Sequence, residues 1–282
     1  MHFQFETNLR YRAAQKMALK QMKKNEKLGE RMNPQELNMI LGEYSEATRV
    51  ELGVLEIPVD QIVGVADSTG MNLYASDFMP VSTANSSYAG QWRELCEEYR
   101  RDNEFLSPLY CYEYIGKFYI IDGKKRVSVL KHLGVPTARS YVVRIMPAMS
   151  EEKHVQLYYE FLKAFELTKT YQVCFSRFGS FEKLQKAMGH DSDQEWSDED
   201  RSLVMQSLRH IAPALEAAFG SYLNVTTADA LLVLLEKYTF EQIRKMPLSS
   251  MVDSLQREWR KLYNICHPDI KLCKDDNQQE VS

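Results

Sequence analysis

One short stretch limits the fold of this chain more than any other, residues 118–134, which read FYIIDGKKRVSVLKHLG. The pattern predicts a buried strand, a turn at Gly123 and a short helix closed by Gly134. A helix that follows a strand directly points its unpaired backbone N–H groups at the turn. Because Lys124, Lys125 and Arg126 stand at that turn, the stretch predicts an anion site, with phosphate as the expected ligand.

The composition is that of an ordinary globular protein. Its 282 residues are 44% hydrophobic and 26% charged, which allows one medium domain with helical additions or two small domains. No apolar run reaches membrane-spanning length and the opening MHFQFE lacks the order of a secretion signal, so we expect a cytoplasmic protein without a membrane partner. The cysteines are scattered, which argues against a disulfide framework and a zinc site, and no metal site is predicted.

The net charge of −4 gives no global attraction to nucleic acid. A local basic segment nevertheless lies between Arg10 and Arg31, where eight basic residues face only Glu26 and Glu30. We interpret this segment as a charged helix lying across the domain, with weak, salt-sensitive nucleic-acid binding as the alternative. A second helix is expected to begin at Asn33 as its cap and to end near residue 42.

The middle of the chain contains segments whose sequence predicts β-strands of a sheet. The run from Val54 to Gly64 contains a proline and suits an edge strand, and residues 109–115 and 118–121 predict a hairpin. A helix over 91–101 and a strand over 138–145 flank this hairpin and the central helix. The polar segment 64–90, with Phe78 and Met79 as anchors, is expected to form a mobile lid over the basic turn.

Two segments and the basic turn carry a family resemblance. The run 57–62, Ser107-Pro108-Leu109 before the hairpin, and the turn with its helix resemble the ParB/sulfiredoxin-like domain over residues 54 to 146. A weaker likeness, through residues 77–80 and the preceding helices, extends to a bacterial family of unknown function. Members of the superfamily bind ATP or CTP, and their glycine-basic turn holds the phosphates. The resemblance therefore implies a nucleotide, with or without Mg²⁺, and a site made of these residues: Gly123, Lys124, Lys125, Arg126 and Ser128.

Residues of the turn that differ from those of the family exclude some of its activities. Sulfiredoxins carry a reactive cysteine in this turn, where Lys124 stands, so sulfiredoxin activity is not expected. Many relatives carry a histidine at the places of Lys124 or Lys125, which puts histidine-dependent chemistry in doubt. A kinase would need a carboxylate base near the phosphate. Asp122 is the first candidate, followed by Asp67 and Asp77, and then by Glu113.

Three functions stay open at this point. The preferred one is a nucleotide-binding regulatory or interaction module, for which we expect nucleotide binding without rapid turnover. The alternatives are a nucleotide-dependent small-molecule kinase and a helical DNA- or protein-interaction protein with a degenerate nucleotide site. The sequence does not define the oligomeric state.

The expected fold class is α+β, with a small mixed sheet of ParB/sulfiredoxin-like type, N-terminal helices and a mainly helical C-terminal region. The expected divisions are residues 1–53, 54–147, 148–266 and a flexible tail over 267–282. The C-terminal region is expected to contain a helix capped by Ser150, a short strand over 170–176, and helices over 180–189 and 197–210, the second with Ser197 and Asp200 as a cap pair. The strongly apolar run 226–238 is expected to form the core of this half. Residues 239–263 resemble a helix-turn-helix, but mixed charges favour plain helix packing with Trp259 and Leu262 buried.

Overall fold

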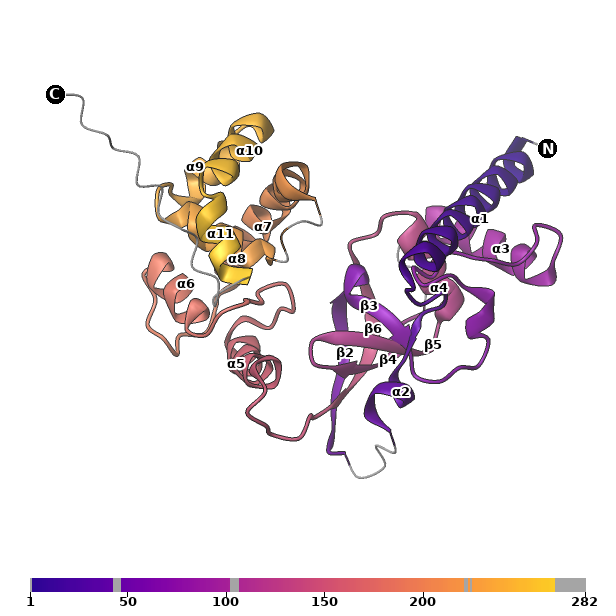
Figure 1. Cartoon of the computed structure of the whole chain (residues 1–282), viewed down its shortest axis with the longest axis horizontal. Helices are drawn as coiled ribbons and strands as arrows, with labels where there is room; N and C mark the ends of the chain where they lie inside the picture. The colour runs from indigo at the N-terminus through magenta and orange to yellow at the C-terminus, as the bar shows by residue number, and fades with distance from the viewer. Residues whose placement is uncertain (1, 43–46, 102–106, 221–222, 224, 267–282) are drawn as a thin grey trace. The chain divides into compact units, whose positions relative to one another are not determined.

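The computed structural model describes residues 2–42, 47–101, 107–220, 223 and 225–266. It divides into two compact units, Met1–Ser150 and Glu151–Ser282, each of which is described by itself (Figure 1). The first unit holds a six-stranded mixed sheet with several helices, and the second consists of helices. The prediction of an α+β fold is confirmed. No helix of the described ranges combines the length and apolar character that crossing a membrane requires.

The sheet of the first unit combines parallel and antiparallel neighbours. From one edge to the other its strands are β1 (Gln35–Glu36), β3 (Ile62–Val65), β5 (Lys117–Asp122), β4 (Leu109–Tyr114), β6 (Thr137–Ile145) and β2 (Arg49–Pro58). The pairs β1/β3, β3/β5 and β4/β6 are parallel, whereas β4/β5 and β6/β2 are antiparallel. The edge strand that the Pro58 run predicts is present as β2, but it begins earlier than Val54, and the end of that run forms β3 near the opposite edge.

The hairpin of β4 and β5 turns at two residues with positive φ. Ile115 has φ 49° and Gly116 has φ 70°, the combination that matches the right-handed twist of the flanking strands. The hairpin prediction is confirmed. It places the end of β5 at Asp122, next to the start of β4, and so fixes the position of the basic turn.

Three helices of the first unit share one core. They are α1 (His2–Leu28), α3 (Ser87–Arg101) and α4 (Lys124–His132), which lie close together in Figure 1. Tyr11, Trp92 and Val129 meet there, and the Tyr11 and Trp92 rings pack edge to face with centroids 5.4 Å apart. The helix expected over 91–101 begins at Ser87, and its Cys96 is buried as core.

The helix expected from Asn33 is wrong at its start. The structure has β1 at this point and a short helix, α2 (Leu37–Leu41), that follows Glu36. The Asn33 side chain instead donates a hydrogen bond to the Tyr74 carbonyl oxygen, 2.8 Å away. The Asn33 side chain thus joins two segments that are distant in sequence instead of capping a helix, which a local sequence pattern does not reveal.

The segment 64–90 is not an open loop. Phe78 and Met79 are buried, as expected of anchors, and Tyr74 and Ala75 are buried with them. A 3-10 turn over Met71–Leu73 and a bridge between Tyr74 and Pro80 shape the segment. Its middle therefore belongs to the core of the first unit. Its first residues contact Lys124, and the Tyr88 ring near its end faces Lys125.

The second unit is a set of helices around one apolar core. They are α5 (Lys153–Thr168), α6 (Ser180–Met188), α7 (Asp198–Phe219), α8 (Thr227–Leu235), α9 (Phe240–Lys245), α10 (Leu248–Arg257) and α11 (Trp259–Cys266). Capping boxes at Ser197, Thr226 and Thr239 start α7, α8 and α9.

Four predictions for this unit need correction. The cap of α5 is Glu152 rather than Ser150, and residues 170–176 form no strand. The helix α7 runs past His210 to Phe219, because the proline inside it does not end the helix. Leu262 is buried as expected, but Trp259 is 39% exposed. The predicted tail lies outside the described residues.

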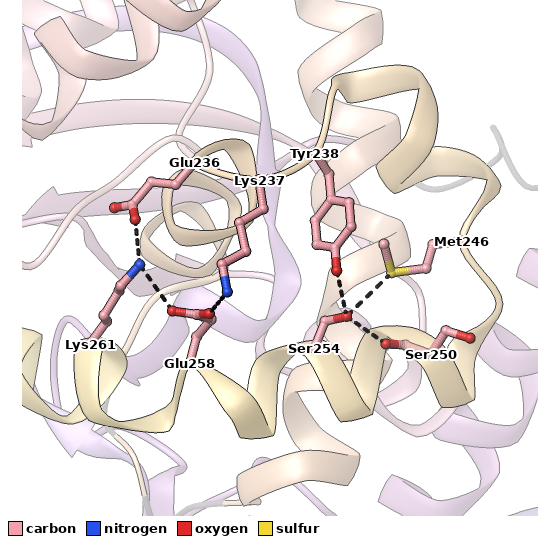
Figure 2. A network of polar contacts seen from close by, with 8 residues as sticks. All are labelled: Glu236, Lys237, Tyr238, Met246, Ser250, Ser254, Glu258 and Lys261. Atoms are coloured by element: carbon pink, nitrogen blue, oxygen red, sulfur yellow. Dashed lines mark hydrogen bonds and ion pairs between the residues drawn. The ribbon is translucent and has the colours of Figure 1, made fainter. Parts of the chain in front are cut away.

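A polar network joins the last helices of this unit (Figure 2). Glu258 accepts hydrogen bonds from Lys237 and from Lys261, and Lys261 also pairs with Glu236 at 2.5 Å. A second part of the network joins Tyr238 and Met246 to Ser254, whose hydroxyl donates to the Ser250 carbonyl oxygen at 2.8 Å. Every lysine of this network faces a carboxylate.

Candidate functional site

The basic turn requires a glycine at its first position. Gly123 follows β5 with φ 105° and precedes α4 as its N-cap. A Cβ atom there would lie 2.6 Å from the Leu109 side chain and 3.0 Å from the Arg126 guanidinium. Any other residue at this position would destabilise the fold, because of both the positive φ and the close packing. The first N–H groups of α4 have no partner within their own helix and face the turn.

Arg126 is fixed to the segment that leads into β4. Its Nη1 donates to the carbonyl oxygens of Ser107 and Pro108 at 2.6 and 2.9 Å and to the Ser107 hydroxyl at 2.6 Å. Its Nη2 pairs with Asp122 at 2.7 Å. The side chain is only 12% exposed, so Arg126 also has a structural role. These hydrogen bonds tie the start of α4 to the segment before the hairpin.

Lys124 reaches the beginning of the segment 64–90. Its Nζ donates to the Thr69 carbonyl oxygen at 2.7 Å and lies 3.5 Å from a carboxylate oxygen of Asp67. Asp67 in turn accepts a hydrogen bond from the Thr69 N–H at 2.8 Å. Hydrogen bonds from Thr69, aided by Lys124, lower the pKa of Asp67. Asp67 is therefore a weak base at neutral pH.

Lys125 faces α3. Its ammonium group donates a hydrogen bond to the side-chain oxygen of Gln91 and stands 5.1 Å from the centre of the Tyr88 ring. Partial burial lowers the pKa of Lys125. A neutral amide oxygen and an aromatic face orient this cation without cancelling its charge.

Ser128 lies on the inner side of α4. It is fully buried and accepts a hydrogen bond from the Trp92 indole N–H at 2.9 Å. The structure thus brings Gly123, Lys124, Lys125 and Arg126 together and places Ser128 in the contact between α3 and α4. Ser128 lies about one helical turn after Lys124, and the sequence pattern alone does not tell which way its hydroxyl points.

The turn borders a hollow of about 680 Å³. Its walls are Leu95, Glu98, Ser107, Ile121, Asp122, Gly123, Lys124, Lys125 and Arg126. Leu95 and Glu98 come from α3, and sequence reasoning missed them because no motif marks a helix face that packs across the turn. Three cations and two carboxylates therefore share one hollow, together with the start of α4.

The remaining carboxylate candidates lie elsewhere. Asp77 accepts a hydrogen bond from the Met79 N–H at 3.0 Å within the packed part of the segment 64–90. Glu113 is fully buried, pairs with Arg144 and accepts from the Gly116 N–H at 2.7 Å. Glu113 therefore has a structural role in the sheet. Among the residues that the structure describes, Asp122 and Asp67 pair with cations of the turn. No group of three or more ligand-type side chains suited to a metal ion occurs in the described part of the chain.

Comparison with known proteins adds little to this geometry. No protein-family model and no curated protein matches the chain. Among solved structures, it is similar to a Pnob8-like ParB-N domain, with 10% sequence identity, a TM-score of 0.23, and coverage of 79% of this chain and 95% of that one. A similarity of this size does not establish a shared fold or function.

Proposed function

We propose that the hollow at the start of α4 binds the phosphate groups of a nucleotide, ATP or CTP, and that the chain is a nucleotide-binding regulatory or interaction module of ParB/sulfiredoxin-like type. The observation that supports this most is the meeting of Lys124, Lys125, Arg126 and the N-terminus of α4 in one hollow. A helix N-terminus stabilises an exposed anion by about 0.3–1 kcal/mol. Lysine and arginine add charge-assisted hydrogen bonds.

The partners of the three cations favour this role. Lys124 donates to the Thr69 carbonyl oxygen and Lys125 to the Gln91 amide oxygen, while Arg126 donates mainly to backbone carbonyl oxygens. Neutral oxygens hold a cation in position and leave its charge available to a phosphate. The volume of about 680 Å³ is of the size that small-molecule sites occupy.

The hollow also suits a nucleotide that carries Mg²⁺. This ion binds through one or two carboxylates together with phosphate oxygens and keeps several waters. Among the described residues in the walls of the hollow, the carboxylates of Asp122 and Glu98 would hold it. Mg²⁺ would neutralise phosphate charge there.

We infer binding without rapid turnover and without sulfiredoxin activity. The lowered pKa of Asp67 makes it a poor base, and Asp122 is paired with Arg126. Cys111, the cysteine nearest the turn in sequence, is buried, and burial raises the pKa of its thiol to about 12. A thiol held neutral in this way is inert as a nucleophile.

A thermal-shift screen with ATP, ADP, CTP and GTP, with and without Mg²⁺, tests the proposal. We expect a triphosphate to raise the Tm of the wild type, because a ligand that binds only the folded state stabilises it. The Lys124→Gln/Lys125→Gln variant should lose this shift. Lys153→Gln/Lys163→Gln, which changes two exposed lysines of α5, should keep it.

A shift that persists in Lys124→Gln/Lys125→Gln would place the nucleotide elsewhere. The absence of any shift with all four nucleotides at millimolar concentration would contradict nucleotide binding itself. Rapid phosphate release by the wild type would favour the kinase or hydrolase alternative, with Asp122→Asn as the variant that tests its base.

A further inference from the structure

The exposed face of α1 carries a regular row of cations. Arg12, Lys16, Lys20, Lys23 and Lys27 follow one another at spacings of four, four, three and four residues, and all five are exposed. Such spacing keeps the side chains on one face of a helix. At about 1.5 Å per residue the row extends over roughly 22 Å. We call these five residues the α1 stripe.

The α1 stripe is not neutralised by the rest of the described chain. No ion pair links any of its five residues to another residue in the described ranges. Arg10, two residues before the stripe, pairs with Glu6 at 3.0 Å. Glu26 is the only carboxylate in the sequence between Arg12 and Lys27. A chain with a net charge of −4 therefore concentrates positive charge on one helix face.

The opposite face of α1 is committed to the core. Tyr11, Ala14 and Ala18 are buried against α3 and its surroundings, and the Tyr11 hydroxyl donates to the Ser82 carbonyl oxygen at 2.8 Å. A helix that lies in a membrane interface buries its apolar face among lipids. Because that face of α1 is already occupied, the stripe is better suited to a water-exposed polyanion than to a membrane.

We propose that the α1 stripe binds the phosphate backbone of a nucleic-acid duplex without reading its sequence. A duplex carries one negative charge per about 1.7 Å of its axis, so roughly a dozen phosphates lie within the length of the stripe. The stripe consists of lysines and one arginine and has no asparagine or glutamine to read adenine. The sequence has no aromatic residue between Arg12 and Lys27, and the neighbouring Tyr11 is buried, so the stripe itself offers no ring to stack on an unpaired base.

The experiment measures binding of the full chain to a fluorescent 30-base-pair duplex of arbitrary sequence by anisotropy, at 50 to 200 mM KCl. The triple variant Lys16→Glu/Lys20→Glu/Lys23→Glu reverses the centre of the stripe and leaves the packed face intact. The matched control is Lys163→Glu/Lys183→Glu/Lys186→Glu, which changes net charge equally on exposed positions of α5 and α6. Circular dichroism confirms that both variants fold.

We expect the wild-type affinity to fall by roughly 50- to 500-fold between 50 and 200 mM salt, the range that three to five phosphate contacts produce. The stripe variant should bind at least tenfold more weakly at 50 mM, with the salt slope reduced by about 2 to 3, while the control stays within twofold of the wild type. Equal losses in the two variants would show a net-charge effect and overturn the proposal. No wild-type binding at 50 mM, or binding to vesicles of 30% phosphatidylserine in place of the duplex, would overturn it as well.

Discussion

Lysines meet oxygen atoms in two very different ways in the two units. In the network of Figure 2, Lys237 and Lys261 both contact the Glu258 carboxylate, and Lys261 also contacts Glu236. In the basic turn, Lys124 and Lys125 donate chiefly to neutral oxygens. A lysine paired with a carboxylate contributes to structure and has its charge compensated. A lysine held by a carbonyl or amide oxygen is positioned and stays available to an anion.

The acidic residues beside these lysines also differ between the two units. Hydrogen bonds from Lys237 and Lys261 lower the pKa of Glu258, which is 8% exposed. The acid beside Lys124, Asp67, is held mainly by Thr69 rather than by the lysine. The charge balance, more than the number of lysines, therefore separates a structural ion network from a candidate anion site.

The largest effect is expected at the glycine that shapes the turn. Gly123→Ala should lower the free energy of unfolding by about 2–3 kcal/mol, because a side chain there meets both an unfavourable φ and Leu109. Gly134→Ala, at a φ of 68° with no neighbour within 4 Å, should cost only about 1 kcal/mol. Urea unfolding followed by circular dichroism measures both, and equal costs would show that packing at Gly123 is unimportant.

Two substitutions of Arg126 distinguish its structural role from the role of its charge in binding. Arg126→Ala should cost about 2 kcal/mol of stability, because it leaves the Ser107 and Pro108 carbonyl oxygens without this donor, and should weaken nucleotide binding ten- to a hundredfold. Arg126→Lys should cost similar stability, since lysine cannot bridge Ser107 and Asp122 at once, yet retain most of the affinity. Titration calorimetry on the folded variants checks this, and identical affinities for Ala and Lys would remove Arg126 from the site.

The network of Figure 2 should respond to pH and not to nucleotide. Glu258→Gln should cost about 1 kcal/mol at pH 7, because two lysines lose their charged acceptor. The folded pKa of Glu258 lies below its ordinary value of 4.5, so its contribution is complete above that pH and is lost as the pH falls through the folded pKa. Urea unfolding at pH 7 and pH 3 should show a larger difference in the free energy of unfolding between wild type and variant at pH 7 than at pH 3. A difference that is unchanged at pH 3 would contradict the assignment.

The smallest effect concerns the acid beside Lys124. Asp67→Asn keeps the acceptor for the Thr69 N–H and removes the carboxylate 3.5 Å from Lys124. Because this frees positive charge, nucleotide affinity should rise two- to threefold, and the rise should shrink at high salt. Calorimetry at 50 and 300 mM salt measures it. A fall in affinity would show that Asp67 itself contacts the ligand or its metal.

Local patterns predicted the elements of the first unit well. The hairpin, the edge strand and the strand–glycine–helix order at the basic turn follow from alternation, turn residues and caps within short stretches. The capping box of Ser197 with Asp200 follows from the same kind of local chemistry. These features depend on neighbours in sequence, which a single chain displays directly.

The features that sequence reasoning missed depend on distant contacts. Asn33 bonds to Tyr74 instead of capping a helix, and the segment 64–90 packs through Tyr74 and Phe78 instead of standing open. Likewise Ser128 faces Trp92, and Glu98 enters the hollow from α3. Each outcome is decided by the side chain that tertiary packing brings opposite, and no spacing in the sequence encodes it.

The most direct test of the central claim is titration calorimetry of pyrophosphate against the wild type and two matched variants. Lys124→Gln/Lys125→Gln removes two lysines that donate chiefly to neutral oxygens, and Lys237→Gln/Lys261→Gln removes two lysines paired with carboxylates. We expect the first variant to bind at least tenfold more weakly, a change of about 1.4 kcal/mol, and the second to stay within twofold of the wild type. Equal affinities in all three proteins, each shown to be folded, would contradict the account.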